Sequence, residues 1–249
     1  TYGNLLDEMQ RFCRFGAETG IVGESELGQA IPYVFVGKKN GNNMIVQGAM
    51  HAREHLTALL VVCQAKYLLQ NPDLRLDGGI YFVPMVNPDG VRLCQEGANW
   101  IEGDAKREAI AVNRGLDFLL WKANAKGVDL NVNFDADWGQ GEQNEFAPAP
   151  SNFVGKEPFC AAETRAIRDF TLMLDPRVTL SYHLKGEEIY WQFGQTGADA
   201  ERDEKLANAV ASYTGYAVKR TPNSVGGYKD WCVKTFGIPS FTVEVGDDR

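Results

Sequence analysis

The sequence predicts an α/β fold in three layers (α/β/α), with a central mixed, twisted sheet of roughly eight strands flanked by helices. The first observation is a strand, helix and strand in succession at residues 44–47, 55–70 and 80–86. Partly parallel sheets are built from this unit with right-handed crossovers. The second observation is that helical and strand patterns keep alternating up to residue 245. The third is that the 249 residues contain no repeat, low-complexity tract or linker, which predicts one domain with one core.

The N-terminal part of the chain is expected to form a helix and then a β-hairpin. Apolar side chains spaced for one helical face predict a helix over residues 4–19. Strand-forming residues occupy 33–37 and 44–47, and the Asn40-Gly41 pair between them is a strong signal for a hairpin turn. The two strands are therefore predicted to pair with each other.

The middle of the chain begins with a helix and ends in a long loop. Residues 55–70 carry apolar side chains around most of the helical wheel, which predicts a largely buried helix. After the strand at 80–86, residues 87–90 predict a turn, and residues 106–120 predict a helical piece. Residues 140–155 are rich in Gly, Pro, Asn, Ala and Ser, which indicates a long ordered loop. Loops of this length in compact domains are commonly functional.

The last part of the chain alternates helices with strands. Before it, residues 128–131 predict only a short edge or loop at the functional site. Proline and turn residues separate the elements that follow. The expected helices span residues 161–174, 203–214 and 228–236, and the expected strands span residues 178–183, 188–193, 216–220 and 240–245.

Composition and charge exclude several classes of protein. With 44% hydrophobic and 23% charged residues, the chain has the composition of an ordinary globular domain. A formal net charge of -8, with no cluster of Lys and Arg, argues against nucleic acid as a partner. No apolar run reaches the roughly 18 residues that a membrane span requires, so we expect no membrane partner. The oligomeric state does not follow from the sequence.

The cysteines and the first residues bear on the cellular compartment. Five cysteines stand singly in mostly helix-like contexts, and an odd count fits reduced thiols better than a disulfide framework. The first four residues lack the basic and then apolar layout of a signal peptide. We therefore expect a cytoplasmic protein. The alternative is a secreted or cell-wall-associated form whose signal sequence has been removed.

Three positions predict a metal centre. His51 and Glu54 lie three residues apart, so their side chains can share one face of a helical turn. A catalytic zinc site takes such nitrogen and oxygen donors from three protein ligands and leaves one position open for water. His183 is the expected third ligand because it ends a predicted strand, where open α/β sheets bind their ligands. His55 is a competing ligand, to which we assign a supporting or structural role.

Short motifs spread from residue 48 to residue 244 form one pattern. They are Gly48-Ala49-Met50-His51-Ala52-Arg53-Glu54, Asn87-Pro88-Asp89-Gly90, Gly127-Val128-Asp129-Leu130-Asn131, His183, Gly226-Gly227 with Asp230-Trp231, and Phe241-Thr242-Val243-Glu244. Their order resembles the zinc carboxypeptidase family along nearly the whole chain. Segments 183–191 and 226–231 look most like the branch that includes γ-D-glutamyl-meso-diaminopimelate peptidases, which cut bacterial cell-wall stem peptides.

The resemblance implies a single zinc peptidase catalytic domain over residues 1–249 with one bound Zn²⁺ ion. By family position, His51, Glu54 and His183 would hold the zinc. Glu244 would be the general base that takes a proton from the attacking water and passes it to the leaving amine. Family members usually continue with a further helix after this last strand. Either such a helix is missing from this chain or the protein is short.

Some positions depart from the family pattern and bear on the substrate. Lys122 stands where many members carry an arginine, so we expect it to stabilise the oxyanion, with a solvated surface lysine as the alternative. Typical members also have an arginine directly after Asn131 that grips the substrate's C-terminal carboxylate, but Val132 occupies that place. Pro222 replaces a common tyrosine. We expect Asn131 and Val132 to lie at the substrate site. Candidates for reading the extra ammonium and carboxylate groups of diaminopimelate are Lys185, Glu187, Glu188 and Lys229.

Three functions follow from these observations. The first is a zinc-dependent hydrolase that cuts the γ-D-glutamyl-meso-diaminopimelate bond of murein-derived peptides. The second is a metallocarboxypeptidase that removes C-terminal amino acids from ordinary peptides, and Val132 counts against it. The third is a non-catalytic, zinc-stabilised module that binds peptides.

Overall fold

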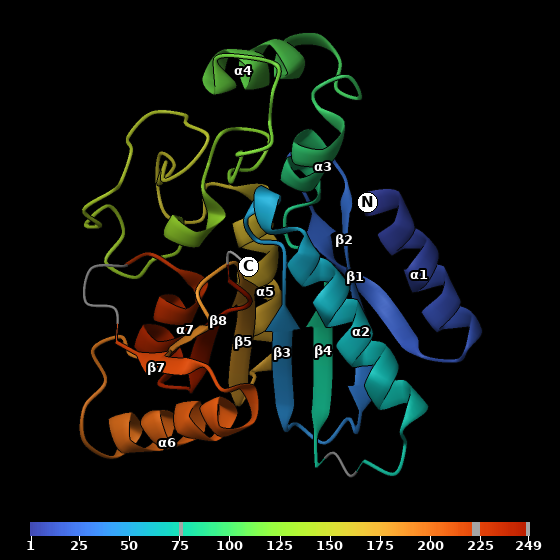
Figure 1. Ribbon diagram of the computed structural model, residues 1–249, viewed down its shortest axis with the longest axis vertical. Coiled ribbons are helices and arrows are strands. Elements are labelled where there is room, and N and C mark those ends of the chain that lie inside the picture. Colours follow the sequence, from blue (N-terminus) through green and yellow to red (C-terminus); the bar gives the residue numbers. More distant parts are fainter. Residues whose placement is uncertain (75–76, 221–224, 248–249) are drawn as a thin grey trace.

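One eight-stranded sheet forms the centre of the protein. The computed structural model describes residues 1–74, 77–220 and 225–247 (Figure 1). The strand order across the sheet is β1-β2-β4-β3-β5-β8-β6-β7. The strands are β1 (Glu18–Glu24), β2 (Ala30–Gly37), β3 (Asn43–Gln47), β4 (Gly79–Val83), β5 (Val178–His183), β6 (Glu188–Tyr190), β7 (Ala217–Lys219) and β8 (Ser240–Glu244).

The sheet is mixed, as the sequence predicted. Its four middle strands, β4, β3, β5 and β8, run parallel to one another. On one side β4 pairs antiparallel with β2, and β2 pairs antiparallel with β1. On the other side β8 pairs antiparallel with β6, which pairs parallel with β7. The parallel strands therefore end at one common edge of the sheet.

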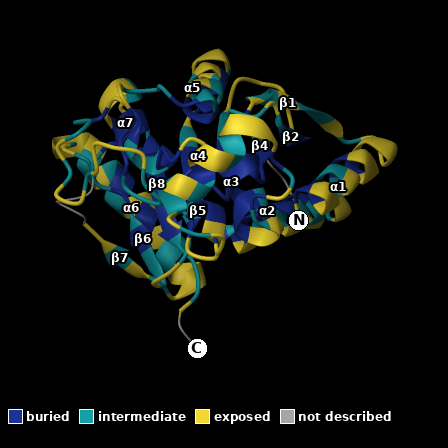
Figure 2. Cartoon of the chain, turned by 90° about the horizontal axis from the view of Figure 1, so that it is seen from above, coloured by how far each residue is buried: buried dark blue, intermediate teal, exposed yellow. Residues whose placement is uncertain are grey.

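Helices cover both faces of the sheet and complete the three layers (Figure 1). Side chains of α1 (Tyr2–Arg14), α2 (Leu56–Gln70) and α6 (Gly197–Thr214) share one hydrophobic cluster with the strands. Side chains of α5 (Ala162–Leu174) and α7 (Tyr228–Phe236) form a second cluster on the opposite face. Seen from above, buried residues gather between the layers while the outer helix faces are exposed (Figure 2). None of the helices in the described residues is long and apolar enough to span a bilayer.

A third cluster lies above the edge where the parallel strands end. It contains residues of α3 (Pro88–Glu96) and α4 (Gly103–Asn113), packed around the fully buried Trp121. The indole of Trp121 lies against Phe118, with ring centroids 5.3 Å apart. This cluster holds the backbone of residues 118–125 beside the strand ends.

The predicted hairpin is wrong. β4 lies between β2 and β3, so the two strands around Asn40-Gly41 do not pair with each other. Gly78 O accepts a hydrogen bond from Lys38 N at 2.9 Å, and Asn42 O accepts one from Gly79 N at 3.0 Å. The strand that pairs with β2 on its other side is β1, which the sequence placed partly inside the first helix. β1 has exposed or half-buried residues throughout, and therefore lacks the alternating pattern that marks a strand.

Three helices differ from their predictions. α1 ends at Arg14 instead of continuing to residue 19. The predicted turn at residues 87–90 is the start of α3, because the Asn87 side chain accepts a hydrogen bond from Gly90 N at 2.9 Å and caps the helix. α2 is buried on one face only, since Leu56 and Leu59 are 61% and 60% exposed. The sequence overestimated its burial because apolar residues extend around the whole wheel.

The remaining elements are present, some with ends displaced by several residues. α5, α7, β5 and β8 agree with the expected ranges to within one residue at each end. α6 starts six residues earlier than expected, at Gly197, and β6 ends at Tyr190. The helical piece predicted at 106–120 is α4, which ends at Asn113. Residues 140–155 form a loop with one isolated bridge between Glu145 and Phe153.

A buried carboxyl group fixes the turn that leads from Lys122 to Asp129. Glu163 Oε2 accepts a hydrogen bond from Asn124 Nδ2 at 2.9 Å, and Asn124 Oδ1 accepts one from Val128 N at 3.0 Å. Glu163 is fully buried, and this burial raises its pKa to about 8. At neutral pH the folded protein therefore keeps this carboxyl group largely protonated.

We expect Glu163 to make folding less favourable as the pH rises. Its pKa is about 8 in the folded protein and near the ordinary value of 4.5 when unfolded, so the stabilising contribution of the protonated form is complete below about pH 4.5 and is lost as the pH rises through about 8. Glu163→Gln removes the titration. The free energy of unfolding is measured with urea between pH 5 and 8. The value for the variant minus that for the wild type should increase by up to about 1.4 kcal/mol per pH unit. A difference that does not change with pH would contradict this.

Candidate metal centre

A hydrogen-bonded turn after β3 carries the first two candidate ligands. Ala49 N donates to Thr57 Oγ1 at 2.7 Å, and that hydroxyl donates to Glu54 O, also at 2.7 Å. Only glycine fits at position 48, because a Cβ there would lie 2.9 Å from Thr57 O. The turn continues into a short 3-10 helix, Ala52–Glu54, which has His51 as its N-cap. The sequence thus places the imidazole and the carboxylate on one helical turn, as predicted.

The third candidate ligand, His183, is the last residue of the neighbouring strand β5. Because β3 and β5 are parallel neighbours, their C-terminal ends meet. His51 Nδ1 lies 2.9 Å from Glu54 Oε1, and His183 Nδ1 lies 3.1 Å from both Glu54 Oε2 and His51 Nδ1. All three side chains are buried, and one donor atom from each lies within 4.8 Å of the others. Two imidazole nitrogens and a carboxylate oxygen form a donor set that fits a zinc ion.

The electrostatics of the cluster favour an ionised carboxylate. Burial opposes ionisation of Glu54, but His51 and His183 outweigh it and hold its pKa well below the ordinary value. Burial also acts against protonation of His51, yet the charges of Glu54 and Asp129 raise its pKa to about 9. Because a ligating imidazole is neutral, a metal ion bound here would take the place of the proton on His51.

Asp129 supports His51 from the side away from the other ligands. Its Oδ1 lies 3.2 Å from His51 Nε2, and its Oδ2 accepts a hydrogen bond from Asn152 N at 3.0 Å. Burial raises the pKa of Asp129, but His51 more than offsets this and lowers it below the ordinary value. A carboxylate on the far nitrogen of a ligating histidine orients the ring and fixes its tautomer. Sequence reasoning missed this role, although Asp129 stands in the motif Gly127 to Asn131, of which residues 130–132 form a 3-10 helix.

Glu244 lies beside the cluster at the end of β8. In the parallel pairing of β5 with β8, Glu244 is the register partner of His183. Burial raises its pKa, while the neighbouring His183 acts in the opposite direction. The structure therefore brings the expected general base next to the three candidate ligands.

Lys122 also lies at the centre. Its carbonyl oxygen accepts a hydrogen bond from Ala52 N at 3.1 Å, which ties its backbone to the turn that carries Glu54. Its side chain is half-buried, and its positive charge opposes the net rise in the pKa of His51 and of Glu244 without reversing it. His55, the competing ligand, belongs to the same turn but is not part of the cluster.

A pocket of about 220 Å³ opens next to Glu244. Among the expected substrate-binding residues, Asn131 and Lys229 line it. Val132, Lys185 and Glu188 are not among the described residues that line this pocket; Lys185 is exposed after β5, and Glu188 pairs with Lys219 at 3.5 Å. Pro222 lies outside the described residues. The described residues that line it are Asn131, Tyr190, Gly227, Lys229, Asp230, Thr242 and Glu244.

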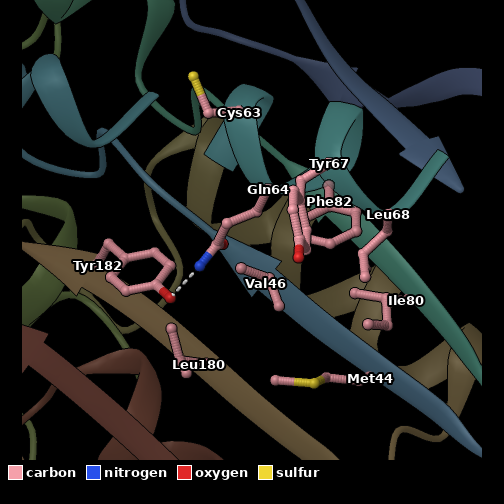
Figure 3. Close-up of a pocket in the computed structure, with 10 residues that line it drawn as sticks. All are labelled: Met44, Val46, Cys63, Gln64, Tyr67, Leu68, Ile80, Phe82, Leu180 and Tyr182. Atoms are coloured by element: carbon pink, nitrogen blue, oxygen red, sulfur yellow. Dashed lines mark hydrogen bonds between the residues drawn. The ribbon is translucent and has the colours of Figure 1, made fainter. Parts of the chain in front are cut away.

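A larger apolar pocket of about 550 Å³ is separate from the metal centre. It lies between α2 and the strands β3, β4 and β5 (Figure 3). Its polar contact is a hydrogen bond from Gln64 to the hydroxyl of Tyr182 at 2.5 Å. It contains none of the cluster residues.

Comparison with known proteins gives a family match. The family model described as zinc carboxypeptidase matches residues 2–249. Gamma-D-glutamyl-L-diamino acid endopeptidase 1 from Lysinibacillus sphaericus is 32% identical over 240 residues, which cover 90% of this chain and 59% of that protein. The chain thus spans less than two thirds of the length of this relative.

Solved structures share the fold. Bovine thrombin-activatable fibrinolysis inhibitor superposes with a TM-score of 0.77 at 20% identity, covering 99% of this chain and 86% of that one. A murein-tripeptide amidase from Escherichia coli O157 superposes with a TM-score of 0.61 at 22% identity, covering 93% of this chain and 84% of that one.

The contact between Asp129 and His51 predicts a measurable effect on metal affinity. Asp129→Asn keeps the shape of the side chain but removes the charge that orients the imidazole, so we expect zinc affinity to fall about 10- to 100-fold. Competition with a chelating dye measures this. Asp135→Asn, the same change at an exposed position, is the matched control. Wild-type affinity in Asp129→Asn would contradict the supporting role.

Proposed function

Since the chain belongs to the zinc carboxypeptidase family, we propose that it is a zinc-dependent peptidase that cleaves the γ-D-glutamyl-meso-diaminopimelate bond of cell-wall stem peptides. The observation that carries the proposal is the buried convergence of His51, Glu54 and His183, with Glu244 beside them. The relative from Lysinibacillus sphaericus, named for cleavage at a γ-D-glutamyl-diamino acid bond, supports the substrate class.

His51, Glu54 and His183 would hold one zinc ion, because their donor atoms already converge. The bound ion would supply Lewis acidity for an attacking water and for the carbonyl group of the substrate. Asp129 keeps the ring of His51 aimed at the cluster. The burial of all three ligands excludes solvent from their outer sides and strengthens their electrostatic interactions.

Glu244 is the proposed proton carrier. Its raised pKa, caused by burial, makes its carboxylate a stronger base than an exposed glutamate. The carboxylate takes a proton from the attacking water and passes it to the nitrogen of the leaving amine. Lys122 places a positive charge near Glu244 and His51. That charge can stabilise the oxyanion by about 3 kcal/mol, the range measured for single oxyanion donors.

Val132 supports an unusual substrate. It occupies the place where typical family members hold the arginine that grips a C-terminal carboxylate, and an isopropyl group cannot form that ion pair. The neighbouring Asn131 can still contact a substrate, because it lines the pocket next to Glu244. This chain lacks the arginine but keeps the candidate metal ligands. We therefore favour cleavage at an amide whose amine side is a diamino acid.

Defined substrates test the proposal directly. Zinc-loaded protein is incubated with L-alanyl-γ-D-glutamyl-meso-diaminopimelate and with ordinary peptides that have free or amidated C-termini, and mass spectrometry identifies the broken bond. We expect release of diaminopimelate from the first substrate. If C-terminal residues are released from ordinary peptides and the first substrate is not cleaved, a conventional carboxypeptidase would be favoured. Binding without any cleavage would favour a non-catalytic module.

Glu244→Gln should separate catalysis from metal binding. The amide has the same shape as the carboxylate but cannot accept the proton, so kcat should fall by about 10²- to 10⁴-fold. Zinc content and the midpoint of thermal unfolding should stay close to the wild-type values. Glu204→Gln, the same change on α6 in an exposed pair with Arg220, is the control. Undiminished turnover by Glu244→Gln would rule out the assigned role.

A further inference from the structure

The side chain of Asn87 bridges two segments of the candidate centre. Its Nδ2 donates to Met50 O and to Ala123 O, both at 3.1 Å. Met50 directly precedes the candidate ligand His51, and Ala123 directly follows Lys122. Asn87 is fully buried, and hydrogen bonds in such an interior are stronger than in water. One amide group therefore joins the backbone on the ligand side of the centre to the backbone on the lysine side.

This position uses every polar group of the asparagine side chain. Its Oδ1 accepts a hydrogen bond from Gly90 N, while the two Nδ2 hydrogens serve one carbonyl oxygen each. An ionised aspartate has no hydrogen to donate, and a serine hydroxyl has one. Glycine is needed at position 90, because a Cβ there would lie 2.4 Å from Ala123 O. The start of α3 thus receives the backbone of the segment that carries Lys122.

Two backbone hydrogen bonds complete the contact between the segments. Ala52 N donates to Lys122 O at 3.1 Å, and Arg53 N donates to Trp121 O at 3.0 Å. From this segment the side chain of Lys122 reaches the centre, because its charge acts on the pKa values of the ionisable groups there. The place of that charge therefore depends on how residues 121–123 dock on the turn.

The turn that carries the candidate ligands has a support of its own. The hydroxyl of Thr57 bonds the backbone of this turn at two points. The amides of Lys122 and Ala123 both donate to Pro150 O, which belongs to the long loop and not to the turn. Loss of the Asn87 bridge should therefore leave the ligands in place and displace the lysine.

We propose that Asn87 is a positioning residue that holds Lys122 at a fixed place beside the candidate metal ligands. The inference rests on the proposed function, in which Lys122 stabilises the oxyanion, and goes beyond it by naming the group that sets the position of that charge. A displaced charge meets the developing oxyanion less well, which lowers kcat. The uncharged carbonyl of the bound substrate gains less from the charge, so KM should change less.

A double-mutant cycle tests whether Asn87 acts through Lys122. Asn87→Ser keeps an oxygen that can cap α3 but cannot donate to both carbonyl groups. With the diaminopimelate tripeptide, kcat should fall by about 10- to 100-fold, while KM and zinc affinity stay close to the wild-type values. In a Lys122→Met background, the same substitution should change kcat by no more than about twofold. Equal losses in both backgrounds would overturn the proposal, and so would a loss confined to zinc affinity.

Hydrogen exchange supplies a measurement that needs no turnover. The amide hydrogens of Ala52 and Arg53 report on the contact, because their acceptors lie in residues 121–122. Both should exchange about tenfold faster in Asn87→Ser than in the wild type, with and without zinc. If the wild type cleaves no peptide, the proposed function fails, but this faster exchange would still support the positioning of Lys122 by Asn87. Unchanged exchange would overturn it.

Two further variants control for folding. Asn43→Ser removes a hydrogen bond of the same kind, from Asn43 Nδ2 to Leu174 O at 2.8 Å, at the opposite end of β3 from the turn. It should keep the wild-type kcat and the wild-type exchange of Ala52 and Arg53. If it instead lowers kcat as much as Asn87→Ser does, the effect is one of stability and the proposal is overturned. If Asn87→Ser does not fold, Asn87→Asp replaces it, because an ionised carboxylate keeps the shape and the cap but cannot donate.

Discussion

The parallel pairing of β3, β5 and β8 is the constraint on which the candidate site depends. It brings the turn after β3, the last residue of β5 and the last residue of β8 to one edge of the sheet. A buried hydrogen bond of 2.9 Å from Gln47 Nε2 to Ser181 Oγ ties β3 to β5 near these ends. A register shift of one residue would turn His183 to the opposite face of the sheet. The strand register therefore sets the geometry of the centre.

Because the residues of the centre are buried, each charged group needs a partner in the folded protein. His51, Glu54 and Asp129 form a chain of charged contacts with almost no exposure to solvent. A buried charge that loses its partner is strongly destabilising, so these residues depend on one another. The same array raises the pKa of His51 and holds that of Glu54 low. Metal binding would be coupled to folding through this array, because a bound ion would take the place of a proton among groups that the fold has already brought together.

The sequence identified the candidate ligands because histidine is rare in this chain and the motifs around it are local. His183 could be placed at a strand end from its own neighbours, and His51 and Glu54 from their spacing. The hairpin prediction was wrong because strand pairing depends on the whole sheet. In the structure β4 pairs with β2 in the place that the prediction gave to β3. The support from Asp129 and the pocket position of Lys229 were beyond sequence reasoning, because both depend on contacts between segments far apart in the chain.

The central claim is that two imidazoles and one carboxylate coordinate a single zinc ion. Zinc K-edge X-ray absorption on protein loaded with one equivalent of metal tests it most directly. The account predicts a first shell of nitrogen and oxygen at about 2.0–2.2 Å, with two imidazole rings in the wild type and one in His183→Ala. A sulfur neighbour at about 2.3 Å, or a shell that is the same in wild type and variant, would contradict it.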